Sequence, residues 1–403
     1  MSTWRHQVPV RSPLSAAALL AGARAAMGNG RSEAAVRDLT ELLQRRYSPA
    51  DLVLTDSGTS ALRAALVGAL EARPGAAVAL PAFCCYDLAT AANGADVPVV
   101  LYDVDPHSLA PDLASLRRAL HLNVGAIVVV HLYGYPVDLV EVNHLAAEAG
   151  AVVIEDAAQA AGGTLRKRPL GTQSSVAVLS FGRGKGMTGG SGGALLAHDE
   201  AGGRIVERAK SLLAAPERGW PGLLAIAAQM VLERPHLYAL PAALPFLHLG
   251  ETIYRAPHQP RTATPASCAV VTATWTMADR EVETRWSNAA RLLAALGRKG
   301  RAFGAISTAA EARPGYLRLA VLASPEVRRA AAGSAARRLG VSPSYPKVLS
   351  EVEQLVARCV NRDGAFPGGR TLAARLCTFP THGRLGPGDR AGLEQWIETV
   401  DAS

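Results

Sequence analysis

The chain has 403 residues, of which 49% are hydrophobic and 19% charged, with a formal net charge of +8. This length exceeds what one compact core usually holds, so we expect two domains, and the composition excludes a disordered chain. No arginine-rich block with interleaved aromatic residues accompanies the basic charge, so we expect no nucleic-acid partner. The charge is explained either by a generally arginine-rich composition or by an anionic substrate.

The cysteines and the hydrophobic segments indicate where the protein resides. Five cysteines, with Cys84 and Cys85 adjacent, form no disulfide framework, and no secretory signal is recognisable near Met1, so we expect a reducing, cytoplasmic location. The most hydrophobic stretch, residues 221–249, is interrupted by charges and prolines and is too broken to span a membrane. We expect it to form a buried helical insertion or a dimer contact, with contact to a membrane surface as the alternative.

Between residues 50 and 200, short apolar runs alternate with segments of helical periodicity, which is typical of repeated βα units. Helices are expected over 60–71 and from a cap at Asp138 to residue 149. The expected strands are 52–55, 76–80, 97–102, 126–131, 151–155, 176–181 and 194–197. Uniformly apolar strands and right-handed crossovers predict an α/β fold with a doubly wound, mostly parallel sheet.

Proline and glycine residues between 215 and 265 mark a change of domain. We expect a large α/β domain over 1–250, with N-terminal helices and the hydrophobic insertion. A smaller C-terminal α+β domain is expected over 251–403, with a long helix at 268–295.

Lys185 lies in a glycine-rich loop between two expected strands, and Asp156 directly follows another. Ligands of open α/β sheets bind beyond the carboxyl ends of the strands, so these side chains can meet there. Together they suggest an imine-forming amine and the counter-charge of a pyridoxal phosphate ring. Lys185 would then need a lowered pKa, which burial and a nearby cation would provide. Taken singly, the two residues could equally be a surface lysine and a helix cap.

The start of the helix after the first strand offers a phosphate site. Gly58 and Thr59 would present backbone N–H groups at the positive end of the helix dipole, although an ordinary Ser or Thr cap is the alternative. No His-Glu-x-x-His and no Cys-x-x-Cys pattern occurs, so no metal site is expected.

Four motifs carry a resemblance to a known family. They are Ser57-Gly-Thr-Ser-Ala-Leu62, His131-Leu-Tyr-Gly134, Val153-Ile-Glu-Asp-Ala-Ala-Gln-Ala160 and Ser180-Phe-x-x-x-Lys185. From about 52 to 196 the chain resembles the DegT/DnrJ/StrS family of sugar aminotransferases, which are fold-type I pyridoxal-phosphate (PLP) enzymes.

The resemblance implies a role for each matching residue. Lys185 would bind the cofactor covalently and act as acid and base, and Asp156 would pair with the ring nitrogen. Gln159 would lie near the 3-hydroxyl of the ring, and Ser180 with the backbone of Gly58 and Thr59 would hold the phosphate.

The sequence also departs from the family pattern at three places, one of which is the glycine-rich tail of the lysine loop, Gly189-Gly-Ser-Gly-Gly193. Cys85 stands where the family commonly stacks an aromatic ring on the cofactor, and Phe83 or Tyr86 would have to compensate. The motif that reaches the phosphate across the dimer interface is reduced to residues 258–262, in which only Arg261 is retained.

The resemblance implies a homodimeric aminotransferase. Glutamate or glutamine would donate the amino group to a keto-sugar, nucleotide-linked, in glycan, polysaccharide or antibiotic-sugar biosynthesis. Two alternatives stay open: a PLP enzyme that performs another reaction on an amino acid, and a non-catalytic regulatory protein with the same fold.

Overall fold

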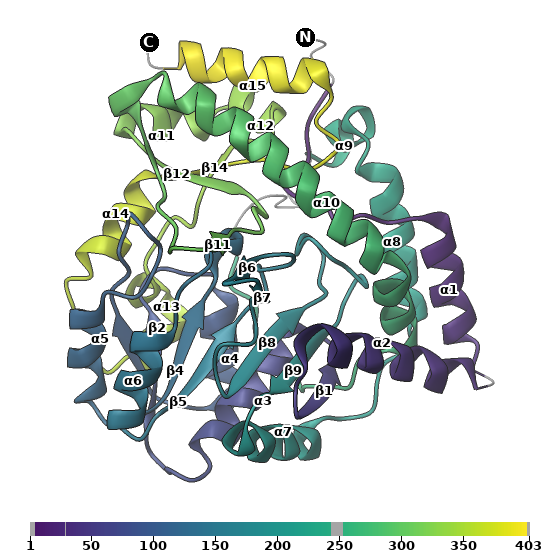
Figure 1. Ribbon diagram of the computed structural model, residues 1–403, viewed down its shortest axis with the longest axis vertical. Helices are drawn as coiled ribbons and strands as arrows, with labels where there is room; N and C mark the ends of the chain where they lie inside the picture. The colour runs from purple at the N-terminus through teal and green to yellow at the C-terminus, as the bar shows by residue number, and fades with distance from the viewer. Residues whose placement is uncertain (1–4, 29, 243–252, 401–403) are drawn as a thin grey trace.

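The computed structural model describes residues 5–28, 30–242 and 253–400. Its centre is a seven-stranded sheet in the order β1-β9-β8-β5-β4-β2-β3 (Figure 1). The neighbours from β3 to β8 pair in parallel, whereas β9 is antiparallel to both β1 and β8. The strands are β1 (Asp51–Thr55), β2 (Ala77–Pro81), β3 (Val99–Tyr102), β4 (Val124–Val130), β5 (Val152–Asp156), β8 (Val176–Ser180) and β9 (Gly193–Ala197).

Both faces of this sheet are covered, as the apolar strands predicted. On β4, Val128 joins a core that includes α3 (Gly58–Leu70) and α7 (Glu200–Leu212), whereas its neighbour Val129 joins a core with α5 (Leu113–Leu120) and α6 (Val140–Glu148). Successive side chains of a strand point to opposite faces, so a strand buried on both sides must be apolar throughout. Figure 1 shows α5 and α6 together at one side of the sheet. The doubly wound, mostly parallel sheet is confirmed.

A second, antiparallel sheet has the order β10-β12-β14-β13. Its strands are β10 (Phe303–Ala305), β12 (Leu319–Ala323), β13 (Ser342–Pro343) and β14 (Leu376–Phe379). The helices of this part are α11 (Pro325–Ala331), α12 (Ser334–Arg338), α13 (Glu353–Val356), α14 (Pro367–Arg375) and α15 (Pro387–Thr399). This is the expected C-terminal α+β part. The long helix α10 (Pro265–Gly297) extends the predicted 268–295 at both ends.

Several local features differ from the sequence prediction. Helix α3 begins at Gly58 because the Ser57 hydroxyl accepts the Ser60 N–H at 3.0 Å and caps it. Two-residue strands β6 (Thr164–Leu165), β7 (Arg168–Pro169) and β11 (Ala312–Arg313) form a third sheet that is too short to leave a periodic pattern. Near the N-terminus lie α1 (Ala16–Ala26) and α2 (Arg31–Tyr47), and α4 (Asp87–Ala95) follows β2.

The N-terminal arm, residues 5–11, packs against the smaller sheet and its helices. The Gln7 N–H donates to the Arg338 carbonyl at 2.9 Å, and Arg318 donates to the Pro9 carbonyl. Arg5 pairs with Asp389 at 2.8 Å. The two ends of the chain therefore lie at the same end of the molecule (Figure 1). The division into domains at residue 250 stays a prediction.

The hydrophobic insertion contains α8 (Trp220–Leu232) and α9 (Pro235–Ala242). Leu223 and Ile226 of α8 are buried against α1 and α10, whereas Trp220 and Leu224 are exposed. Among the described residues, no helix has the length and apolar character needed to cross a bilayer. Residues 243–249 of the predicted insertion lie outside the described residues.

Candidate functional site

A pocket opens at the carboxyl ends of the parallel strands. All seven residues that the sequence analysis selected line it: Gly58, Thr59, Cys85, Asp156, Gln159, Ser180 and Lys185. The other lining residues are Leu62, Asp87, Leu88, Val130 and Ala158. The structure thus brings together residues that are up to 127 positions apart, because the strands that carry them end at the same edge of the sheet.

One end of the pocket is built to receive an anion. The first N–H groups of a helix have no intrahelical partner, and at the start of α3 those of Gly58 and Thr59 lie beside the Ser180 hydroxyl. A Cβ atom at Gly58 would lie only 2.7 Å from the Ser180 Cβ, so only glycine permits this approach. The helix dipole, the N–H groups at the helix start and a hydroxyl together suit a phosphate.

Lys185 lies in a loop that is well fixed to the rest of the chain. The Phe181 N–H donates to the Gly192 carbonyl at 2.8 Å, and the Ser267 hydroxyl donates to the Ser191 carbonyl at 2.6 Å. Within the described part of the chain, the Lys185 amine has neither a hydrogen bond nor an ion pair. The loop therefore presents an uncommitted amine to the pocket.

The pKa of the Lys185 amine is shifted in the opposite direction from the one that the sequence analysis expected. Burial alone would lower the pKa of the amine, but Cys85, Asp87 and Asp156 together raise it above its usual value. The expected lowered pKa is therefore wrong for the protein alone, because two acids and a thiol face the amine where a cation was expected. A positively charged ring beside Asp156 would remove part of that effect.

Asp156, at the end of β5, is a buried carboxylate without an ion-pair partner among the described residues. Its Oδ1 accepts the Ala158 N–H at 2.9 Å. Burial raises its pKa, and this outweighs the lowering by that hydrogen bond, by Lys185 and by His131. A buried acid that forms no ion pair among the described residues, and that lines a pocket, fits a ligand that brings a positive charge.

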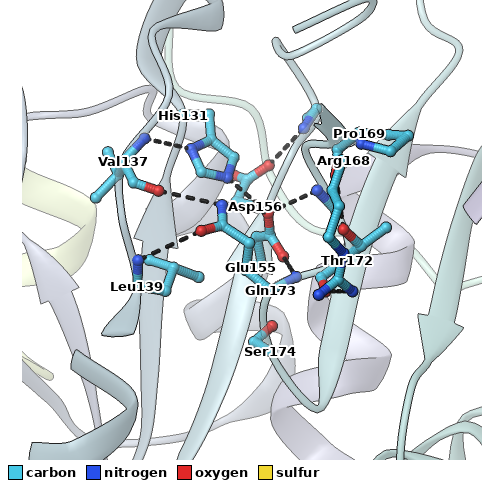
Figure 2. A network of polar contacts seen from close by, with 12 residues as sticks. His131, Val137, Leu139, Glu155, Asp156, Arg168, Pro169, Thr172, Gln173 and Ser174 are labelled. Atoms are coloured by element: carbon cyan, nitrogen blue, oxygen red, sulfur yellow. Dashed lines mark hydrogen bonds and ion pairs between the residues drawn. The ribbon is translucent and has the colours of Figure 1, made fainter. Parts of the chain in front are cut away.

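The preceding residue, Glu155, belongs to a complete hydrogen-bond network on the other face of the sheet (Figure 2). Its Oε1 contacts His131 Nε2 at 2.7 Å and accepts the Gly171 N–H at 2.6 Å, and Oε2 accepts the Gln173 N–H at 2.7 Å. The Val137 N–H donates to His131 Nδ1, so Nε2 carries the ring proton that faces Glu155. Burial would raise the pKa of Glu155, but the hydrogen bond and charge of His131 and the two N–H donors lower it.

Gln159 and Cys85 also line the pocket, and both form hydrogen bonds. Gln159 accepts the Tyr133 N–H on Oε1 at 2.9 Å and donates from Nε2 to the Tyr345 hydroxyl at 3.0 Å. The Cys85 thiol donates to Asp87 Oδ2 at 3.3 Å. Burial, followed by the charge of Asp87, raises the pKa of the Cys85 thiol to about 12, so it stays a neutral thiol.

Sequence reasoning missed Asp87 and Tyr345. Asp87 is the first residue of α4, where an acid is an ordinary favourable helix start, so the sequence held no signal for it. Phe83 and Tyr86, which were expected to compensate for Cys85, do not line the pocket; their rings pack on Tyr345 at 5.6 and 6.3 Å.

The reduced motif at 258–262 lies beside the end of the pocket that suits an anion, within the same chain. His258 Nε2 contacts Asp56 Oδ2 at 2.8 Å, and the Asp56 N–H donates to the Arg261 carbonyl at 2.9 Å. The Arg261 guanidinium pairs with Glu217 at 3.3 Å. The segment therefore flanks the β1–α3 turn, next to the pocket.

The strand order, the single antiparallel strand β9 and a lysine pocket at the carboxyl edge define a fold-type I α/β protein. Residues 29–215 match the model of the DegT/DnrJ/EryC1/StrS aminotransferase family. The resemblance that the sequence motifs indicate is confirmed over this segment.

Individual relatives match over the same part of the chain. An L-glutamine:2-deoxy-scyllo-inosose aminotransferase of Micromonospora echinospora is 36% identical over 159 residues, which cover 40% of this chain and 38% of that protein. A dTDP-3-amino-3,4,6-trideoxy-alpha-D-glucose transaminase of Streptomyces venezuelae is 39% identical over 162 residues, which cover 39% of this chain and 41% of that protein. The matched segment thus spans about two fifths of the length of the curated relatives.

Solved structures resemble the whole chain in fold. The sugar aminotransferase CalS13 of Micromonospora echinospora has a TM-score of 0.74 at 22% identity and covers 98% of this chain and 99% of its own. A sugar aminotransferase structure from Streptococcus pneumoniae, Spr1654 in its PLP form, has a TM-score of 0.74 at 14% identity, with coverage of 98% and 99%. The fold therefore extends over the C-terminal half, where the sequence match is lost.

Proposed function

We propose that this protein is a PLP-dependent aminotransferase that uses a keto-sugar as acceptor. The observation that carries the proposal is the meeting of an amine, a buried acid and an anion cradle in one pocket. No two of these three groups are adjacent in sequence, and each suits a different part of the same cofactor: its aldehyde, its ring nitrogen and its phosphate.

The residues of the pocket fit PLP by their own chemistry. Gly58, Thr59 and Ser180 would hold the phosphate, Asp156 the protonated ring nitrogen and Gln159 the 3-hydroxyl. Cys85 would lie against the ring in place of an aromatic side chain. When bound, PLP supplies an aldehyde that condenses with amines and a ring that accepts the electron pair of a broken Cα–H bond.

Lys185 acts both as a nucleophile and as a base in the proposed reaction. Its amine is the nucleophile that binds the cofactor and, once an amino-acid donor has displaced it, the base that takes the proton from Cα. Asp156 holds the proton on the ring nitrogen: two unit charges 4 Å apart contribute about 4 kcal/mol at an effective dielectric of 20. The apolar side chains of Leu62, Leu88 and Val130 limit the access of water to the pocket.

The substrates are part of the proposal. Glutamate or glutamine as donor and a nucleotide-linked keto-sugar or cyclitol as acceptor are supported by the names of the relatives, which act on an inosose with L-glutamine and on a dTDP-linked sugar. The biosynthesis of glycans, polysaccharides or antibiotic sugars would be the context. Five free thiols support a reducing, cytoplasmic location.

We also propose a homodimer, in which residues 258–262 of one subunit face the pocket of the other. Within one chain these residues lie beside that chain's own β1–α3 turn, so the arrangement across the interface rests on the family resemblance.

The test begins with the visible absorption of the purified protein after addition of PLP. L-Glutamine or L-glutamate is expected to abolish the visible band, and a keto-sugar nucleotide is expected to restore it. Borohydride should attach the cofactor irreversibly to the wild type and not to Lys185→Ala, as measured by intact mass.

The control for this test is Lys210→Ala, which removes another lysine that is paired with Asp51 and does not line the pocket. A band that no amino donor changes would overturn the aminotransferase proposal. Release of ammonia would favour the alternative of another PLP reaction, and persistent attachment in Lys185→Ala would overturn the assignment of the lysine.

A further inference from the structure

Gln159 is oriented by two hydrogen bonds that come from different parts of the fold. The Tyr133 backbone N–H, after β4, can only donate, so the atom that faces it at 2.9 Å must be the amide oxygen of Gln159. The amide nitrogen then faces the Tyr345 hydroxyl at 3.0 Å, which accepts from it. Flipping the amide would bring two donors together at Tyr133 and lose that bond.

The hydrogen bonds of the Gln159 side chain leave one N–H available to the pocket. The –NH₂ group has two hydrogens, and Tyr345 accepts only one of them. Gln159 lines the pocket, so the second hydrogen is available there, whereas the oxygen is already engaged with Tyr133. The pocket therefore meets Gln159 as a hydrogen-bond donor.

Tyr345 itself is held firmly in place. It is 8% exposed and follows β13 of the smaller sheet, where the Ser344 N–H donates to the Leu376 carbonyl at 3.0 Å. Its ring is nearly parallel to that of Tyr133, with centroids 6.0 Å apart and an interplanar angle of 14°. The side chain is therefore fixed on both sides before it meets Gln159.

We infer that Tyr345 is a positioning residue of the cofactor site: by accepting one hydrogen of Gln159, it fixes the amide so that a donor faces the 3-oxygen of the cofactor ring. This inference rests on the proposed function. It assigns to the C-terminal part of the chain, outside the segment that matches the family model, a direct influence on the electronic state of the bound cofactor. A donor at that oxygen favours its anionic form.

The experiment compares Tyr345→Phe with the wild type in the PLP-loaded protein. The substitution keeps the ring and removes the hydroxyl, which accepts from Gln159 and also interacts with the Tyr133 hydroxyl. We expect the pH midpoint of the visible absorption of bound PLP to shift in the same direction as in Gln159→Leu. The dissociation constant for PLP should rise about two- to tenfold, as expected for one hydrogen bond.

The matched control is Tyr86→Phe. The Tyr86 ring packs on the same cluster, 6.3 Å from that of Tyr345, but its hydroxyl makes no hydrogen bond to Gln159 among the described contacts. This variant should keep the wild-type midpoint and affinity. Tyr345→Phe added to Gln159→Leu should cause no further shift, because the group through which Tyr345 acts is already gone.

The outcomes separate the two proposals. If the wild type does not bind PLP, the proposed function fails. If the wild type binds PLP and Tyr345→Phe has the midpoint of the wild type, or shifts it equally in the Gln159→Leu background, the inference about Tyr345 is overturned while the function stands. A shift in Tyr86→Phe of the same size would show a general packing effect and would also overturn it.

Discussion

Two consecutive acids of β5, Glu155 and Asp156, have opposite surroundings. Side chains alternate across a strand, so Glu155 points to one face of the sheet and Asp156 toward the pocket. Glu155 is matched by His131, Gly171 and Gln173, and its pKa is lowered (Figure 2). Asp156 has one backbone donor and a raised pKa. Burial acts on both, and the hydrogen-bond donors and charges around each acid separate the structural acid from the one that is available to a ligand.

The strongest test of this difference is to remove Glu155, the acid whose hydrogen-bond partners are all in place. Glu155→Ala would leave the His131 ring N–H and two backbone N–H groups buried without an acceptor. We expect the free energy of unfolding to fall by about 3–5 kcal/mol, measured by urea denaturation. Glu141→Ala, on the exposed surface of α6, is the control and should change it by less than about 0.5 kcal/mol. A loss below about 1 kcal/mol for Glu155→Ala would mean that the network does not stabilise the fold.

Removing the charge of Asp156 should affect the binding of the cofactor and not lower the stability of the fold. Asn at position 156 can still accept the Ala158 N–H, so Asp156→Asn should leave the stability of the cofactor-free protein unchanged or raised. Its dissociation constant for PLP should rise by up to about a thousandfold, because the ion pair with the ring is lost. Titration of PLP by absorbance measures this. If the free energy of unfolding fell by more than about 2 kcal/mol, Asp156 would be needed for the stability of the fold, as Glu155 is.

The pH dependence of stability should separate the two acids again. The folded pKa of Glu155 is lowered, so its contribution is present above the unfolded pKa of about 4.3 and is lost as pH falls through the folded pKa. The folded pKa of Asp156 is raised, so the folded state is favoured while Asp156 is protonated and loses stability as pH rises from about 3.9 through the folded value. Each slope is at most about 1.4 kcal/mol per pH unit.

The measurement is urea denaturation of the cofactor-free protein across this pH range. The difference between wild type and Asp156→Asn should favour the variant increasingly as pH rises. The difference between wild type and Glu155→Ala should shrink as pH falls. Slopes of the same sign for both variants would contradict the opposite pKa directions.

The smallest effect concerns the second acid of the pocket. Asp87 raises the pKa of the Lys185 amine, so Asp87→Asn should lower it. The rate at which an amine-reactive reagent labels Lys185 in the cofactor-free protein should then reach its midpoint at lower pH, as read from peptide masses. Asp363→Asn, a highly exposed acid, is the control. An unchanged midpoint would show that Asp87 does not influence the lysine.

Much of this site follows from the sequence because β-strand periodicity predicts where parallel strands end. Lys185 and Asp156 follow predicted strands and Ser180 lies near the end of one, and one rule about strand ends brings them together. Their roles stay predictions, although their meeting in one pocket is a structural fact.

Other contacts could not be predicted in this way. Tyr345 meets Gln159 across 186 positions, from an antiparallel sheet whose two-residue strand β13 leaves no periodic pattern. Asp87 looks like any acid in the first turn of a helix. The pKa of Lys185 depends on three neighbours that only the folded chain brings together, so sequence reasoning gave it the wrong sign.

The N-terminal arm has a consequence for how the polypeptide reaches its final form during synthesis. Its partners, among them Arg318, His382 and Asp389, are 309 to 384 positions further along the chain. The arm is synthesised long before these partners, so it can dock on them only after they have been made. The large sheet can assemble in the meantime, since none of its strands lies within the arm.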